Sequence, residues 1–432
     1  MGKWVKSLLG AIGPITKGSG ISRDQSHSGE LPAVRYGEIY THHNEYVKDY
    51  VSRISNEVAE TAQPTHRGDI LFAGSGETPD DIGKCVALLD DGVFAGGDLV
   101  IFSPPDGSDP VYWGSLLNIP YVQKQKAMRA QGSSIYHIRP DAIKKIEVVY
   151  DSDADEQRHI AEILTTCDEV IEKTEAVVEK YRAIKAGMLK DLFTRGIGKN
   201  GKLRPPPESA PQHYKDTALG KVPREWEVKS FDSAFELHGN NTLSRAFLTN
   251  QNGVVRNVHY GDVLVKYDTI LDCDDEALPS VIAEGVRQAG NDYLQNCDLV
   301  FADTAEDDTV GKAVELYNVG DRTIVSGLHT IFARPKEDDF ASRWLGYYVN
   351  SDSFHKQLLP FVVGSKVSSI SRTNIKRTFV VIPESDEQQR IAERLSAIDA
   401  KIADELAVVA KYRRVRAGLM ARLLTPPDME VE

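Results

Sequence analysis

One stretch of about forty residues occurs twice in this chain, and no other feature of the sequence restricts the fold as strongly. Asp155-Glu-Gln in the first copy corresponds to Asp386-Glu-Gln in the second, an offset of 231 positions (386 − 155). The same offset holds without a gap over the whole stretch and superposes Lys180-Tyr-Arg on Lys411-Tyr-Arg. Roughly half of the superposed positions are identical, so the two copies are expected to adopt the same local structure.

Both copies have the periodicity of a coiled-coil helix. Apolar residues recur at alternating steps of three and four, which is the 3.5-residue period of a helical seam, and no proline interrupts them. A helix of about forty residues is roughly 60 Å long, more than the width of a small domain. A surface helix packed on its own globular domain is the alternative. The seam positions are Leu164, Cys167, Ile171, Thr174, Val178, Tyr181, Lys185, Met188 and Leu192 in the first copy, and Leu395, Ile398, Ile402, Glu405, Val409, Tyr412, Arg416, Leu419 and Leu423 in the second.

Polar residues interrupt the two seams at equivalent positions. Thr174 corresponds to Glu405, and Lys185 corresponds to Arg416. Polar residues inside a seam cost stability but specify register and partner. We therefore expect these positions to fix how each helix pairs.

The helices divide the chain into two globular heads and their connections. Short apolar runs bounded by turn residues predict mixed α/β heads with a twisted sheet. The heads resemble each other faintly: Gly68-Asp-Ile-Leu is similar to Gly261-Asp-Val-Leu, and Gly132-Ser to Gly364-Ser. The expected segments are head 1 at 1–152, a first helix at 153–196, an extended linker rich in Gly, Pro and charge at 197–215, head 2 at 216–383, a second helix at 384–425 and a tail at 426–432.

Composition excludes several classes of protein. The 432 residues include 64 acidic and 51 basic side chains, a net charge of −13, so a uniformly basic nucleic-acid coat is absent although a local basic strip remains open. The four cysteines have no metal-ligand spacing, and no apolar run approaches the roughly 20 residues of a membrane span. Ser103-Pro-Pro-Asp lacks the aromatic residue of an amino-methyltransferase motif. We expect a cytoplasmic protein without metal or catalytic residues.

The order of these segments, with their motifs, resembles the DNA-specificity subunit of type I restriction–modification systems. The resemblance covers nearly the whole chain and rests on Asp386-Glu-Gln-Gln-Arg-Ile-Ala with its copy at Asp155, Leu219-Gly-Lys-Val-Pro-Arg-Glu-Trp, and Ser326-Gly-Leu-His-Thr. It implies an α+β architecture. In it, two mixed α/β target recognition domains are separated by two long antiparallel coiled-coil helices, with a pseudo-twofold internal repeat.

The same resemblance implies a division of labour. Each head would read one half of a bipartite site on double-stranded DNA, while the helices set the half-site spacing and dock two methyltransferase subunits, with restriction/translocase subunits in the larger complex. S-adenosylmethionine, ATP and Mg²⁺ would belong to those partners, so this chain would hold no cofactor. A specificity subunit for a type IIG-like methyltransferase–nuclease, or a coiled-coil scaffold binding proteins, are the alternatives.

Candidate DNA contacts were chosen by side-chain chemistry. Lys and Arg neutralise phosphates, and Gln or Asn amides read adenine edges; a solvated helix face is the alternative for the basic cluster near residue 124. The candidates are Lys17, Ser19, Arg23, Arg35, Tyr36, Gln123, Lys124, Gln125, Lys126 and Arg129 in head 1, and Asn241, Ser244, Arg245, Lys366, Ser368, Arg372 and Lys376 in head 2. The residues expected in helix packing or partner binding are Leu164, Ile171, Val178, Tyr181, Met188, Leu192, Leu395, Ile402, Val409, Tyr412, Leu419 and Leu423.

Overall fold

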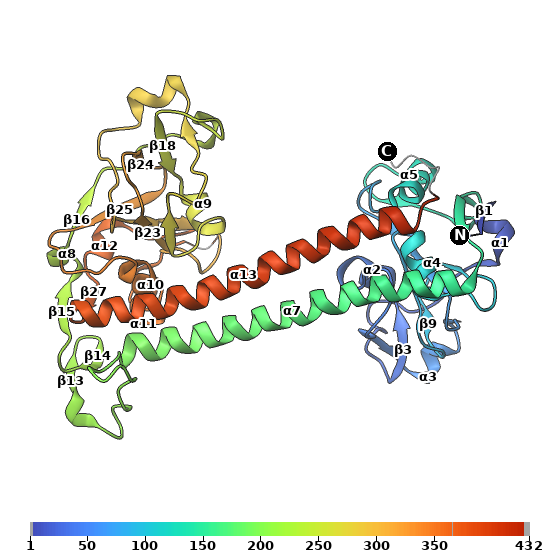
Figure 1. The fold of residues 1–432 in the computed structure, drawn as a ribbon, viewed down its shortest axis with the longest axis horizontal. Coiled ribbons are helices and arrows are strands. Elements are labelled where there is room, and N and C mark those ends of the chain that lie inside the picture. The colour runs from blue at the N-terminus through green and yellow to red at the C-terminus, as the bar shows by residue number, and fades with distance from the viewer. Residues whose placement is uncertain (1–2, 365, 427–432) are drawn as a thin grey trace. The chain divides into compact units, whose positions relative to one another are not determined.

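The computed structural model describes residues 3–364 and 366–426 and forms two compact units. Unit 1 contains the chain up to residue 176 together with residues from 405 onward, and unit 2 contains residues 177–404. Two long helices, α7 (Ala154–Thr194) and α13 (Ser385–Leu423), pass through both units (Figure 1). Each unit therefore holds one head and part of each helix. Residues 427–432 of the expected tail lie outside the described residues.

Head 1 is a mixed α/β structure, as predicted. Its central sheet has the antiparallel order β2-β10-β6-β8, and a second sheet has the order β4-β3-β9-β5. The elements are β1 (Trp4–Leu8), α1 (Leu9–Ile12), β2 (Ile15–Lys17), β3 (Leu31–Val34), α2 (Tyr36–Thr41), β4 (Ser52–Ile54), α3 (Asn56–Ala59), β5 (Gln63–Pro64), β6 (Ile70–Ala73), β7 (Ser75–Gly76), β8 (Cys85–Ala87), β9 (Phe94–Ala95), β10 (Leu99–Phe102), α4 (Pro110–Leu116), α5 (Pro120–Arg129), β11 (Tyr136–His137), α6 (Pro140–Ile143) and β12 (Glu147–Asp151).

Head 2 repeats this plan with one more strand in the central sheet, which has the order β16-β25-β21-β23-β19. Its elements are η1 (Pro211–His213), β13 (Tyr214–Thr217), β14 (Gly220–Pro223), β15 (Glu227–Ser230), α8 (Phe231–Ala234), β16 (Phe235–His238), η2 (Arg245–Phe247), β17 (Leu248–Thr249), β18 (Val255–Val258), α9 (Tyr260–Val265), β19 (Ile270–Asp272), β20 (Ser280–Val281), η3 (Ala283–Gln288), β21 (Leu299–Ala302), β22 (Thr304–Ala305), β23 (Ala313–Tyr317), β24 (Thr323–Ser326), β25 (Thr330–Pro335), α10 (Trp344–Val349), α11 (Asp352–His355), η4 (Leu359–Phe361), β26 (Ser368–Ser369), α12 (Arg372–Ile375) and β27 (Phe379–Ile382).

The two heads use the same side-chain amides to hold their elements together. Asn118 Nδ2 donates to the carbonyl oxygen of Cys85 over 2.8 Å, and Asn350 Nδ2 donates to the carbonyl oxygen of Ala313 over 2.8 Å. These contacts tie α4 to β8 and α10 to β23. The common scaffold is therefore conserved inside the chain even where the sequences of the heads differ.

A second pair of amides joins each head to its long helix. Gln157, in the first Asp-Glu-Gln copy, accepts from the backbone N–H of Asp109 over 3.0 Å and donates to the carbonyl of Asp151 over 2.7 Å. Gln388, in the second copy, makes the same two bonds in head 2 over 2.9 and 2.8 Å. Both glutamines are buried, so the repeated motif fixes the angle at which helix and head meet within a unit.

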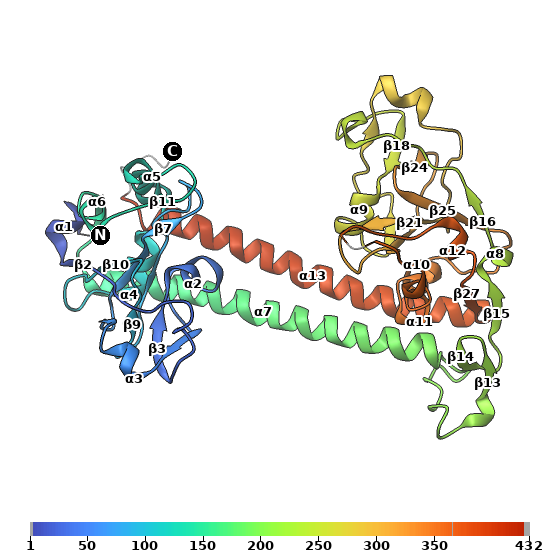
Figure 2. The same ribbon diagram turned by 180° about the vertical axis from the view of Figure 1, so that it is seen from behind.

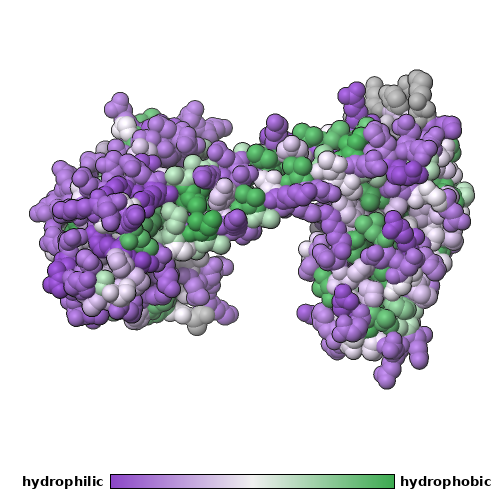
Figure 3. Space-filling model, turned by 60° about the horizontal axis from the view of Figure 1, so that its bottom comes forward, coloured by the Kyte–Doolittle hydropathy of each residue, from purple (hydrophilic) through white to green (hydrophobic). Residues whose placement is uncertain are grey.

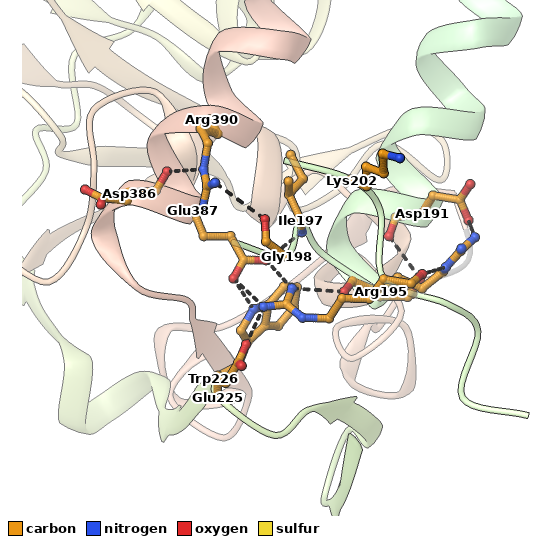
Figure 4. Close-up of polar contacts among 12 residues, drawn as sticks. Asp191, Arg195, Ile197, Gly198, Lys202, Glu225, Trp226, Asp386, Glu387 and Arg390 are labelled. Carbon is orange, nitrogen blue, oxygen red and sulfur yellow. Dashed lines mark hydrogen bonds and ion pairs between the residues drawn. The ribbon is translucent and has the colours of Figure 1, made fainter. Parts of the chain in front are cut away.

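The linker is folded rather than extended, because it is bound to the start of α13 (Figure 4). The backbone N–H of Ile197 donates to Glu387 over 2.7 Å, and Trp226 Nε1 donates to the same carboxylate over 3.1 Å. Arg204 pairs with both Glu387 and Glu225, and all but 8% of its surface is buried. Burial alone would lower the pKa of Arg204, but the two carboxylates raise it, so this arginine stays charged.

The apolar seam continues into the head cores. In unit 1, Leu164 belongs to the core of head 1, with Leu419 and Leu423 packed against it; in unit 2, Leu192 and Leu395 belong to the core of head 2. None of the seam positions expected from the sequence is fully exposed. Burial of these residues stabilises each helix by tertiary packing rather than by helix propensity alone.

Ion pairs at the seam show that the helices run antiparallel within each unit. In unit 1, Arg416 on α13 pairs with Asp168 on α7 and with Glu45 of head 1, the latter over 2.7 Å. In unit 2, Lys185 on α7 pairs with Asp399 on α13. The two pairs are exchanged by the 231-residue offset, so the polar seam positions at Lys185 and Arg416 hold the register on both sides of the internal repeat.

We predict that Arg416→Met lowers the free energy of unfolding by about 3 kcal/mol, because it leaves two nearly buried carboxylates without a counter-charge. Arg413→Met is the matched control on the same helix, since the Arg413–Glu175 pair is exposed and contributes at most about 1 kcal/mol. Urea unfolding measures both. Equal effects of the two substitutions would contradict a special role for Arg416.

Candidate nucleic-acid interface

In head 1, the structure brings most of the candidates near the chain start together. The loop that follows Lys17 and the beginning of α2 at Arg35 and Tyr36 line a common hollow of about 480 Å³. Arg23 is exposed on this loop, whereas Ser19 donates from Oγ to the carbonyl of Thr61 over 2.8 Å and so anchors the loop. The hollow is lined by Gly20, Ile21, Ser22, Gln25, Arg35, Tyr36, Gly96, Gly97 and Asp98.

The α5 cluster does not form the predicted DNA contact. Lys126 is completely buried, its Nζ donates to the carbonyl of Gly83 over 2.7 Å, and it lies 5.6 Å from the centre of the Phe72 ring. Gln125 is buried and makes two bonds to the backbone of Glu147, over 2.8 and 2.9 Å. These two predictions are wrong, because both polar ends point inward and are already hydrogen-bonded.

The internal repeat explains why these side chains are structural. Gln357 in head 2 bonds the backbone of Phe379 as Gln125 bonds that of Glu147, over 3.0 and 2.8 Å. Gln123 donates to the carbonyl of Ile82 over 2.8 Å, and His355 makes the corresponding contact with Val310. Gln123 is thus also occupied. Of the remaining α5 candidates, Lys124 is exposed and Arg129 is half-buried against the Gln125 carbonyl.

In head 2, one of the three loop candidates is internal. Asn241 is buried and donates to the carbonyl of Ser326 over 3.0 Å, so it holds its own loop, and its predicted role in reading bases is wrong. Ser244 is exposed. Arg245 is half-exposed and forms a two-pronged pair with Asp262, 2.8 Å for each bond, which raises the pKa of Arg245. Its charge is therefore partly neutralised but remains at the surface.

The later candidates of head 2 lie close to that loop. Arg372, at the start of α12, donates to the carbonyl of His238, directly before the loop. Lys376 is exposed and pairs with Asp232 over 2.9 Å, while Lys366 is exposed on the hairpin before β26. Ser368 is half-buried in β26. The loop and the α12 region therefore form one surface with several cations.

One residue that the sequence analysis missed is Tyr260. It begins α9 as Tyr36 begins α2, and the two share a Tyr-Gly-acid motif at an offset of 224 (260 − 36). Tyr260 contacts the rings of His259 and His329, with centres 4.7 and 5.3 Å apart. Burial, with nearby Arg245, lowers the pKa of His259, which favours its neutral ring. The motif was visible in the sequence, but at another offset than the helices.

Among the described residues, no group of three or more His, Cys, Asp or Glu side chains could hold a metal ion. The same part of the chain contains no helix that is long and apolar enough to cross a membrane.

Residues 223–407, which include most of head 2 and the first half of α13, match the family model of the type I restriction modification DNA specificity domain. The chain belongs to this family. The MjaVIII specificity subunit of a type I restriction enzyme from Methanocaldococcus jannaschii is 23% identical to this specificity subunit over 310 residues, which are 70% of this chain and 67% of that one.

Two solved structures share its fold over nearly the full length. The S subunit of a type I restriction–modification system from M. genitalium has a TM-score of 0.55 at 14% identity, covering 99% of this chain and 97% of that one. A chain from a study of complex assembly and conformational transition of the type I system has a TM-score of 0.53 at 13% identity, covering 99% and 98%. The α+β fold predicted for the specificity subunit is confirmed.

We predict that Lys126→Leu leaves DNA affinity unchanged, because head 2 has Leu358 at the equivalent position, 232 residues later. Burial lowers the pKa of Lys126 from 10.5 to about 8. The unfolded chain therefore binds this proton more tightly, so the wild type gains stability relative to the variant as pH rises from 8 to 10.5. Urea unfolding across this range measures the difference, and a difference independent of pH would rule out the assignment.

Proposed function

We propose that each head of this specificity subunit reads one half of a bipartite site on double-stranded DNA. The observation that carries the proposal is the contrast between scaffold and surface. Asn118 and Asn350 hold the same scaffold in both heads, whereas the loop of Lys17 to Gln25 differs from the loop of Asn240 to Asn250. Two versions of one scaffold with different polar loops are suited to two different DNA sequences, since loops on a rigid frame carry recognition.

The surface loops have the chemistry that duplex recognition needs. Arg23 and Lys366 are exposed cations that can contact phosphates, and Arg35 and Tyr36 line a hollow beside polar loop atoms. Arg245 is held in place by Asp262 with part of its surface open. Phosphate contacts position a protein on DNA, while side chains in the grooves distinguish bases. The mixture of the two in each head supports a reading surface.

We further propose that the chain catalyses nothing itself and acts in the cytoplasm with two methyltransferase subunits and with restriction/translocase subunits. Methylation, translocation and cleavage would take place in those partners, together with S-adenosylmethionine, ATP and Mg²⁺. Support for two equal partners comes from α7 and α13. Val177 and Ile184 on α7 are exposed and seven residues apart, and the 231-residue offset places exposed Val408 and Val415 on α13 at the matching positions.

These positions form two short apolar stripes, because residues seven apart lie on one face of a helix. Figure 3 shows apolar side chains at the surface of the long helices. A duplicated stripe can bind two copies of the same partner through the same contacts. We therefore assign one methyltransferase subunit to each stripe.

The function as a whole is tested by mapping adenine methylation in the host genome with and without the gene. We expect exactly one class of signal to vanish on deletion: a motif of two short unlike halves separated by unspecified bases. Retention of every methylated motif after deletion would refute the proposal.

We predict that helix length sets the gap between the half-sites. Insertion of seven residues after both Val178 and Val409 preserves the heptad register and lengthens each helix by about 10 Å, which corresponds to about three base pairs. Methylation mapping should show the same two halves with a wider gap. The same seven residues inserted at the exposed Glu208 in the linker are the control and should leave the gap unchanged.

We predict that Val177→Ser combined with Ile184→Ser leaves a complex with one methyltransferase subunit instead of two, and that Val408→Ser combined with Val415→Ser has the same effect. The loss of apolar contact area weakens one docking site at a time. Native mass spectrometry counts the subunits. Val254→Ser is the control, because Val254 is 83% exposed but lies in head 2 away from both helices.

A further inference from the structure

Each head carries a short hairpin at the same place in its fold. In head 1, β11 pairs with β7, and both lie at one edge of the head (Figure 2). In head 2, β26 pairs with β22 in the corresponding way. The two hairpins, residues 131–137 and 363–369, are related by an offset of 232. They share Gly-Ser at the turn but differ at most other positions.

Both hairpins are closed by the same backbone bonds. Gln131 and His137 exchange two hydrogen bonds of 3.0 and 2.8 Å, and Val363 and Ser369 exchange two of 3.1 and 2.8 Å. Paired bonds of this kind hold the intervening turn in one shape.

The turn itself requires glycine. Gly132 has a φ of +142° and Gly364 a φ of +120°. A Cβ at either position would lie 1.9 Å from a carbonyl oxygen, that of Ile135 or of Val367. No side chain fits there, so the same tight turn is built into both heads.

Each turn presents one branched aliphatic side chain to solvent. Ile135 is 56% exposed and Val367 is 50% exposed, and they occupy equivalent positions. Three residues later, Ile138 and Ile370 are buried and anchor the hairpins to their heads. A single exposed aliphatic residue is ordinary, but the same exposure at the same rigid tip in two heads of different sequence indicates a shared purpose.

The surroundings of these tips are basic on a chain whose net charge is −13. Residues 363–377 contain four Lys or Arg and no Asp or Glu, and residues 131–145 contain three Lys or Arg and one Asp. Cations beside an apolar tip match a DNA groove, where phosphates line both edges and base steps form the floor. A protein partner for an apolar tip would not need this excess of positive charge.

We infer that Ile135 and Val367 act as apolar wedges that enter a groove of the DNA, one at each half-site, while the neighbouring cations hold the phosphates. This inference rests on the proposed reading of DNA by the heads. Because the geometry is the same in both heads, the wedges contribute affinity and local unstacking at either half-site rather than the choice of sequence. Side chains of this type are used elsewhere to unstack base steps.

The test uses the full chain assembled with its methyltransferase subunits and a duplex that carries the motif found by methylation mapping. 2-Aminopurine in one half-site or the other reports unstacking by its fluorescence. Ile135→Ser and Val367→Ser are each expected to weaken binding about tenfold, and the double variant about a hundredfold, with an unchanged salt dependence because no charge is altered. Each single variant should also lose the fluorescence increase in one half-site only.

Met128→Ser is the matched control, because Met128 is 69% exposed in head 1 but lies on α5 outside the hairpin. It should bind DNA like the wild type. Unchanged DNA affinity and fluorescence in both hairpin variants would overturn the inference, and so would a loss of methyltransferase subunits, which would make the tips a protein contact. If the wild type itself shows no preference for the split duplex, the proposed function fails instead.

Discussion

The amide of one glutamine in each Asp-Glu-Gln motif determines how a head is held on its helix. Gln157 and Gln388 each use both ends of the amide on the backbone of a head, and both are shielded from water. A buried backbone group left without a partner costs about 1–3 kcal/mol, so loss of either amide would release two such groups at once. The helix therefore begins at a fixed angle to its head.

Charge pairing then specifies how the helices run beside each other. Apolar seams alone tolerate shifts in register, since one aliphatic contact resembles another. The pairs of Arg416 with Asp168 and of Lys185 with Asp399 are specific, because a shift would leave charges partly buried without partners. The polar interruptions of the seam are thus a source of specificity, at some cost in stability, and the chain uses them once in each unit.

The long helices could be predicted from the sequence because their period, their length and their duplication are all local properties. The repeat within the heads was harder to see. Gly68 and Gly261 looked equivalent in sequence, yet Gly68 precedes strand β6 while Gly261 lies in helix α9, whose counterpart is α2. Short strands leave few identical residues, and insertions change the offset from 224 near Tyr260 to 232 near Val367.

The candidate interface could be predicted only in part, for a physical reason. An exposed and a buried lysine look the same in a sequence, and only the fold shows that Lys126 points at the Gly83 carbonyl. The loop of Arg23 and the hairpin of Lys366 were found because polar turn residues stay at the surface. Tyr260 was missed since one half-exposed tyrosine carries no signal until its counterpart Tyr36 is recognised.

The matching amide anchors have a consequence for how genes of this kind diversify. Gln125 and Gln357 grip their strands through backbone atoms alone, and so do Gln157 and Gln388. Contacts to the main chain do not depend on which side chains a neighbour carries. A recombination event that exchanges one head at the first turn of a long helix would therefore supply a foreign head with all the bonds it needs, and a new half of the target sequence could be acquired in a single genetic step.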